Sequence, residues 1–134
     1  MSKSLIQTTN QSSQSVAVNS IISLGSTLRR FGCNCRLSGN AIEVDGEGYY
    51  KVDATISLAP TAVGAVTVAL YENGVQIPSA IAYGSVSTAD NAITLPIVAT
   101  IRKGCGCNGA SNLTLVLLEG ASTVNNVSVR VEKA

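Results

Sequence analysis

The sequence contains no histidine and no tryptophan, and only 13% of its 134 residues are charged. Histidine is the commonest general base and the commonest metal ligand among side chains. Its absence excludes a Ser-His-Asp or Cys-His catalytic arrangement within one chain. The formal net charge of +1 offers no electrostatic basis for binding nucleic acid or an anionic membrane. We therefore expect a protein that is not an enzyme, with no nucleic-acid partner and no membrane partner.

Long hydrophobic runs and long helix-forming runs are also missing. No apolar stretch approaches the length of a membrane span, and the N-terminal MSKSLIQTTNQSSQS lacks the apolar core of a secretory signal. We therefore expect the chain to be assembled in the cytoplasm of its host. Apolar residues make up 46% of the chain, which is enough for the core of one folded domain. Small and β-branched residues dominate, so the sequence predicts a nearly all-β protein.

The clearest strand pattern lies between residues 48 and 83. One face of the first strand is apolar and the other is polar, with Tyr50, Val52, Ala54, Ile56 and Leu58 on the apolar face. A second strand over 65–72 leads into Asn73-Gly74, where both residues tolerate the positive φ of a two-residue hairpin turn. The turn predicts that Glu72 faces Val75, Leu70 faces Ile77 and Val66 faces Ile81. Pro78 is expected on an edge strand or at a bulge, because it has no N–H to donate.

Further strands are expected around this hairpin, at residues 4–8, 40–44, 92–102, 113–118 and 127–131. Residues 25–36 are predicted to be irregular. The LTLVLL run at 113–118 is apolar on both faces, so we expect it at the centre of a sheet or in an interface. Short strands separated by turn residues at this spacing are typical of an antiparallel jelly-roll sandwich of about eight to ten strands.

The phrases SGNAIEVDGEGYYKVDATISL and VTVALYENGVQIPSA resemble the complement-type and tumour-necrosis-factor-like jelly-roll family. The residues that carry the resemblance are a Gly-x-Tyr strand opening and an LY-x-NG hairpin, here Gly48, Tyr49, Tyr50, Leu70, Tyr71, Asn73 and Gly74. Within the family, the chain is similar to short phage virion decoration or head-fibre proteins. The resemblance covers most of the chain, and its motifs are structural rather than catalytic.

The resemblance implies a homotrimer on the surface of a phage virion, bound to the major capsid protein or another virion component. The polar residues 1–14 are then an N-terminal arm or docking segment, and residues 15–134 are the jelly-roll domain. Only 4% of the residues are aromatic, whereas the family's trimer core is often rich in aromatics, so the axis would be aliphatic. We predict Val98, Val116 and Leu118 as trimer-interface residues. The alternative is a carbohydrate- or receptor-binding module on a virion, spore or cell surface, with Tyr49 or Tyr50 exposed to a glycan.

Four cysteines form two Cys-x-Cys pairs in loops far apart in the sequence, Cys33 with Cys35 and Cys105 with Cys107. Disulfides between the two loops would stabilise the fold by restricting the unfolded chain, in the loop-entropy model. Four thiolates are also a known structural zinc site, although its usual spacing is Cys-x₂₋₄-Cys. The third alternative is free thiols that pack as small apolar groups. The spacing alone leaves all three open.

Overall fold

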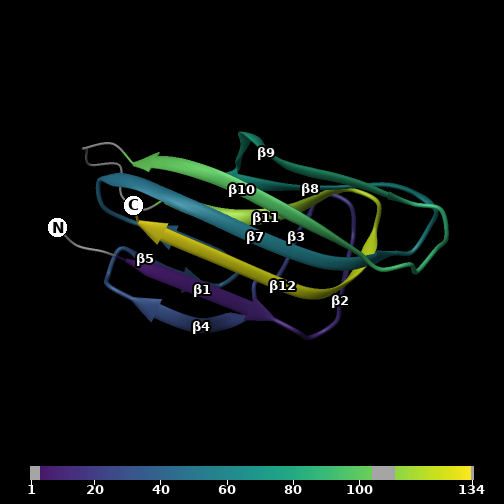
Figure 1. Cartoon of the computed structure of the whole chain (residues 1–134), viewed down its shortest axis with the longest axis horizontal. Coiled ribbons are helices and arrows are strands. Elements are labelled where there is room, and N and C mark those ends of the chain that lie inside the picture. Colours follow the sequence, from purple (N-terminus) through teal and green to yellow (C-terminus); the bar gives the residue numbers. More distant parts are fainter. Residues whose placement is uncertain (1–3, 104–110, 134) are drawn as a thin grey trace.

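A computed structural model describes residues 4–103 and 111–133, which form two antiparallel sheets packed face to face (Figure 1). In order across sheet A lie β10 (Ile93–Lys103), β7 (Gly48–Pro60), β12 (Ser122–Lys133), β1 (Leu5–Asn10) and β4 (Ser26–Phe31), with β2 (Gln14–Val16) paired to β12. In order across sheet B lie β5 (Cys35–Ser38), β6 (Ala41–Val44), β11 (Ser111–Glu119), β8 (Gly64–Glu72) and β9 (Val75–Val86), with β3 (Ser20–Ile21) paired to β11. From β6 onward the chain alternates between the sheets except at the β8–β9 hairpin, which is jelly-roll connectivity.

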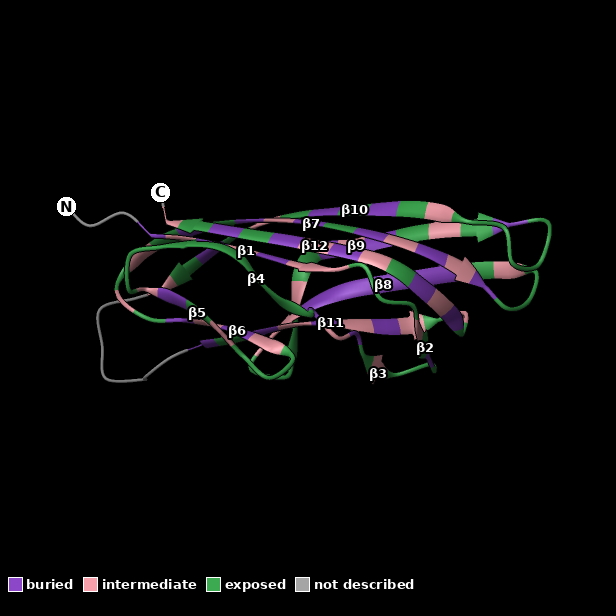
Figure 2. Cartoon of the chain, turned by 90° about the horizontal axis from the view of Figure 1, so that it is seen from below, coloured by how far each residue is buried: buried purple, intermediate pink, exposed green. Residues whose placement is uncertain are grey.

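The core lies between the sheets and consists almost entirely of aliphatic side chains. The residues that the alternation predicted on the inner face of β7 are all buried: Tyr50, Val52, Ala54, Ile56 and Leu58. From sheet B, β11 supplies Leu113, Leu115 and Leu117, each no more than 1% exposed. Figure 2 shows this alternation of buried and exposed residues along the long strands of both layers. The predicted jelly-roll sandwich is confirmed, and the described residues form twelve strands rather than eight to ten.

The β8–β9 hairpin forms at the predicted turn, but its register shifts beyond the first two pairs. Asn73 and Gly74 both have positive φ, and Glu72 pairs with Val75 as predicted. The predicted pair of Val66 with Ile81 is wrong, because Ala69 pairs with Ile81 and Val66 with Gly84; Leu70, predicted opposite Ile77, lies at the register shift between Ala69 and Tyr71. Pro78 lies on the edge strand β9 beside the irregularity, and Ser79 adopts a φ of 67°. Between the pairs Tyr71–Gln76 and Ala69–Ile81, β9 contains more residues than β8. This bulge lies at Pro78, which has no N–H to donate to the ladder.

The prediction that residues 25–36 are irregular is also wrong. Ser26–Phe31 form β4 at the edge of sheet A, and Cys35 begins β5 at the edge of sheet B. All six residues of β4 are exposed, so the strand has none of the alternation of buried and exposed residues on which sequence-based assignment depends. Its pairing with β1, rather than burial of one face, holds it in place.

Residues 5–10, which the sequence places in a docking arm, form β1 within sheet A. This strand pairs with β12 on one side and with β4 on the other, so both of its backbone edges are occupied. Ile6 is fully buried, and the Lys133 N–H donates to the Ser4 carbonyl at 2.9 Å. The division between an arm and a domain at residue 14 stays a prediction, and residues 5–10 are paired on both edges within this chain. No helix long and apolar enough to cross a membrane occurs in the described part of the chain.

Candidate functional site

The described residues hold no cluster of three or more His, Cys, Asp or Glu side chains that could ligate a metal ion. The features that point to function are instead the Cys33–Cys35 loop at one end of the sandwich and the outward faces of the two sheets. We call this end the cysteine end; it also contains the 45–47 turn, the last residue of β10 and the first residue of β11.

A network of partly buried and exposed hydrogen bonds organises the cysteine end. The Ser4 hydroxyl donates to Asn34 Oδ1 at 2.7 Å, and Asn34 Nδ2 donates to the Asp45 carbonyl at 2.7 Å. The Tyr50 hydroxyl, at the inner end of β7, shares its single proton between the carbonyls of Asp45 (2.8 Å) and Gly46 (2.9 Å). Burial, and then the neighbouring Cys35 and Asp45, raises the pKa of Tyr50 to about 12. The loop that carries the cysteines is thus held by Ser4 and by Asp45, and Tyr50 in turn binds the 45–46 turn.

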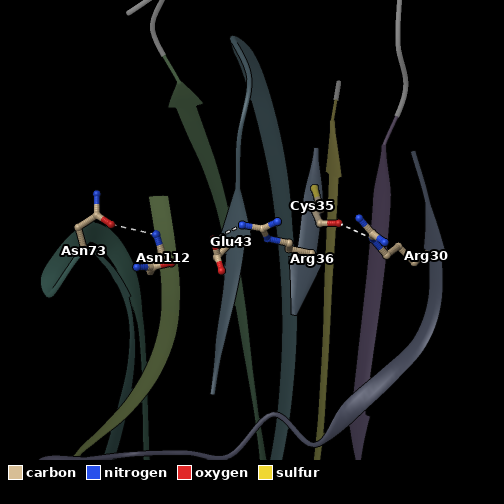
Figure 3. A network of polar contacts seen from close by, with 6 residues as sticks. All are labelled: Arg30, Cys35, Arg36, Glu43, Asn73 and Asn112. Atoms are coloured by element: carbon tan, nitrogen blue, oxygen red, sulfur yellow. Dashed lines mark hydrogen bonds and ion pairs between the residues drawn. The ribbon is translucent and has the colours of Figure 1, made fainter. Parts of the chain in front are cut away.

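The two cysteines on either side of Asn34 lie in different environments. Cys33 is exposed, whereas Cys35 is fully buried at the start of β5. Arg30 Nε donates to the Cys35 carbonyl at 2.8 Å, which connects β4 of sheet A to β5 of sheet B (Figure 3). Burial raises the pKa of the Cys35 thiol to about 11, although Arg30 and Lys133 lower it in part. Cys35 is therefore a protonated, poorly nucleophilic thiol at neutral pH.

Cys105 and Cys107 lie outside the described residues, but the residues that flank them belong to the cysteine end. Lys103 pairs with Gly48, and Ser111 pairs with Val44, which in turn pairs with Cys35. Ser111 and Cys35 are therefore two strands apart in the ladder, and the spacing between neighbouring strands puts their backbones about 10 Å from each other. Cys107 is four residues before Ser111 in the sequence, and four residues of extended chain can span about that distance. The topology thus leaves the disulfide, the zinc and the free-thiol alternatives open, and the intact mass measured without reductant distinguishes them.

Buried Cys35 makes the reduced protein less stable in alkali. An unfolded thiol ionises near pH 8.5, whereas folded Cys35 keeps its proton until about pH 11. Between those values the unfolded state binds fewer protons, so the free energy of unfolding falls as pH rises. We expect Cys35→Ala to flatten this decline between pH 8.5 and 10.5 in urea unfolding with reductant. Exposed Cys33→Ala is the control, and equal slopes in the two variants would contradict the assignment.

Two further polar contacts join the strands of sheet B near this end (Figure 3). Arg36 and Glu43 form an ion pair at 3.0 Å between β5 and β6, and hydrogen bonding to Arg36 holds the Glu43 pKa below its usual range. The Asn112 N–H donates to Asn73 Oδ1 at 2.9 Å, and the Asn73 N–H donates to the Asn112 carbonyl at 2.9 Å. The hairpin turn is therefore fixed to β11 as well as closed on itself.

The three predicted interface residues lie on opposite faces of the sandwich. Val98, on the outward face of β10, is 72% exposed. Val116 and Leu118 are on the outward face of β11, at the centre of sheet B, and both are half-buried. The structure therefore does not bring the three residues together. Tyr50 is in the core and Tyr49 is 55% exposed, so only Tyr49 is accessible to a glycan.

The outward face of sheet A is built from small, mostly uncharged side chains. Near its centre, Arg130 Nη2 lies 2.8 Å from Asp53 Oδ2, and Lys51 and Glu132, of opposite charge, are directly opposite in the ladder. Val98 is opposite Asp53 on the other side. The centre of this face therefore carries no net charge.

No protein-family model matches the chain, and no curated protein matches its sequence. Solved structures do match its fold. Murine APRIL superposes with a TM-score of 0.75 at 9% identity, covering 99% of this chain and 100% of that one. The globular domain of zebrafish complement 1qA gives 0.70 at 8% identity, with 94% of both chains covered. The fold is that of the tumour-necrosis-factor and complement-1q jelly rolls.

A phage protein has the same fold. The vertex protein P5 of PRD1 superposes with a TM-score of 0.65 at 14% identity, covering 97% of this chain and 96% of that one. The fold implied by the sequence resemblance is therefore confirmed across nearly the whole chain. At such low identities the likeness concerns the fold alone.

Proposed function

We propose that this protein is a homotrimeric surface module of a phage virion, acting as a capsid decoration or head-fibre protein. The observation that carries the proposal is the match of fold to the PRD1 vertex protein over 97% of this chain. The sequence resemblance to short virion proteins supports the same assignment. The partner would be the major capsid protein or another virion component. The protein would then act by binding, through an interface of buried surface and matching symmetry, and would catalyse no reaction.

The outward face of sheet A supports self-association as the means of assembly. Removing charges from water is costly unless they are paired, and the Asp53–Arg130 ion pair already meets that condition. Val98 adds a large exposed apolar side chain to the neutral surface. The centre of this face, around Asp53, Val98 and Arg130, can be buried against a second copy without leaving an isolated charge. We therefore propose that Val98 contributes to the trimer contact.

Native mass spectrometry of wild type and of three variants tests this proposal. We expect wild type to give a trimer mass and Val98→Glu to give a folded monomer, because three carboxylates would be buried without partners. Val63→Glu is the matched control, since Val63 is 64% exposed in the turn after β7 and should leave the trimer intact. The double variant Val116→Glu/Leu118→Glu tests the outward face of sheet B in the same way.

The outcomes separate the interface from the assembly itself. A trimer that persists in Val98→Glu and is lost in the double variant would assign the contact to sheet B. A monomeric wild type would contradict the trimer and would favour a monomeric carbohydrate- or receptor-binding module. Co-sedimentation with assembled capsids then tests the attachment, and a trimer that binds no capsid component would contradict the virion role.

A further inference from the structure

The strand β4 presents an open backbone edge. Within the described residues it pairs with β1 alone, and no backbone hydrogen bond involves its other side. All six of its residues are exposed, and Figure 1 shows it as the outermost strand of sheet A, with no strand beyond it. A free strand edge offers a row of unpaired N–H and C=O groups, which is a template for pairing with another chain.

The other edges of the sandwich carry features that disfavour such pairing. Two of the three prolines lie in edge strands, Pro78 in β9 and Pro96 in β10. Proline has no N–H to give to an added strand, and the irregular backbone at Ser79 further interrupts β9. The third of the strands that end a sheet, β5, is only four residues long, and β2 and β3, which each pair with one strand, have three and two residues. Among these edges, β4 alone combines six residues with the absence of proline.

The open edge is also basic, with no acidic residue near it to compensate. Arg29 lies opposite Gln7 on the outward face, and its side chain has no hydrogen bond or ion pair among the residues described. Arg30 uses one of its five N–H donors, on the Cys35 carbonyl. The neighbouring strands β1 and β5 contain no Asp or Glu. The Arg29 guanidinium is therefore available to a carboxylate on a strand laid alongside, and Arg30 adds positive charge on the other face of β4.

Apolar side chains flank the two arginines. Leu28 is 53% exposed and Phe31 is 64% exposed, and Phe31 is directly opposite Leu5 of β1. An added strand would cover part of this surface, so its recognition would combine main-chain hydrogen bonds, charge and apolar contact.

We propose that β4 is a docking edge for an extended, acidic segment of a partner protein, which adds to sheet A as a further strand. Charge complementarity decides the occupant. A second copy of this chain paired edge to edge through β4 would bring four arginines together without an acidic residue. An acidic strand instead places carboxylates beside Arg29 on the outward face while its backbone pairs with the free edge.

The test uses a blocked synthetic peptide of alternating glutamate and valine, with a lysine–valine peptide and an N-methylated glutamate peptide as controls. Amide hydrogen exchange is measured for the full-length protein with and without each peptide. We expect the acidic peptide to slow exchange at alternate amides of β4 and not at those of β10. The lysine peptide should bind at least about tenfold more weakly, and the N-methylated peptide should give no protection, because it cannot form the ladder.

Point variants separate the edge from charge in general. We expect Arg29→Gln to weaken binding about threefold and Arg29→Glu about tenfold, as for exposed ion pairs lost and then reversed. Arg102→Gln removes the same charge from β10, at the other edge of sheet A, and should change affinity by less than about twofold. Each of three results would overturn the proposal: equal effects of Arg29→Gln and Arg102→Gln, equal binding of the acidic and basic peptides, or β4 amides already protected by self-association.

Discussion

Replacing Tyr50 by alanine is expected to lower the free energy of unfolding by about 3–5 kcal/mol, among the largest losses for a single buried side chain. Tyr50 is fully buried, and it is the largest of the fully buried side chains in the described core. Its loss removes the packing of an aromatic ring and leaves a cavity at the cysteine end. It also leaves the carbonyls of Asp45 and Gly46 without the hydroxyl that both contact.

The adjacent Tyr49→Ala is the control, because the same residue type one position earlier points to solvent and is 55% exposed. We expect it to cost less than about 1 kcal/mol, as surface substitutions generally do. Tyr50→Phe isolates the hydroxyl and should cost about 1–2 kcal/mol. Urea unfolding of the three variants provides the measurement. Similar losses for Tyr49→Ala and Tyr50→Ala would mean that the alternation of β7 is misassigned.

Substitution of Gly25 by alanine is expected to destabilise the protein by about 2–5 kcal/mol. Gly25 has a φ of +80°, and a Cβ there would meet the Thr9 carbonyl oxygen and lie 2.6 Å from Asn10 Cβ. The left-handed conformation costs an L-residue about 1–2 kcal/mol, and overpacking against the backbone of β1 adds about 1–3 kcal/mol. The chain crosses from β3 in sheet B to β4 in sheet A at this point, so the strain acts directly on the open edge.

Gly39→Ala separates the two contributions. Gly39 also has a positive φ, of +60°, but a Cβ there meets nothing within 4 Å. We expect Gly39→Ala to cost only the conformational part, about 1–2 kcal/mol, when the urea midpoints are compared. If Gly25→Ala cost no more than Gly39→Ala, the close approach of β1 to Gly25 would be refuted.

Much of the fold could be predicted because short stretches of the sequence carry the patterns of strands and turns. The alternation in 50–58 identifies the buried face of β7, and Asn73-Gly74 identifies the turn of the β8–β9 hairpin, since each signal is complete within a few residues. The register of the same hairpin could not be predicted beyond Tyr71. It depends on how β9 bends at Pro78 and Ser79, and sequence spacing does not determine that bend.

The candidate site was less predictable than the fold. The Cys33–Cys35 pair drew attention by its spacing, but nothing local indicated that Asn34 bonds to Ser4 or that Arg30 reaches the Cys35 carbonyl. The one available signal was Tyr50, since a tyrosine on the apolar face of a strand needs a partner for its hydroxyl. The proposed contacts of Val98 with a second copy remain for the native mass measurement to test.

The sequence by itself determined the class of the protein: an all-β chain with an aliphatic core, no histidine chemistry and strands whose inner faces are marked by period-two alternation. Only the tertiary structure decided that Val98 and Val116 face away from each other on different sheets, and that β4 is an open basic edge. The physical reason is that hydrophobic alternation selects a face within each strand, whereas strand order and free edges depend on contacts between residues distant in sequence.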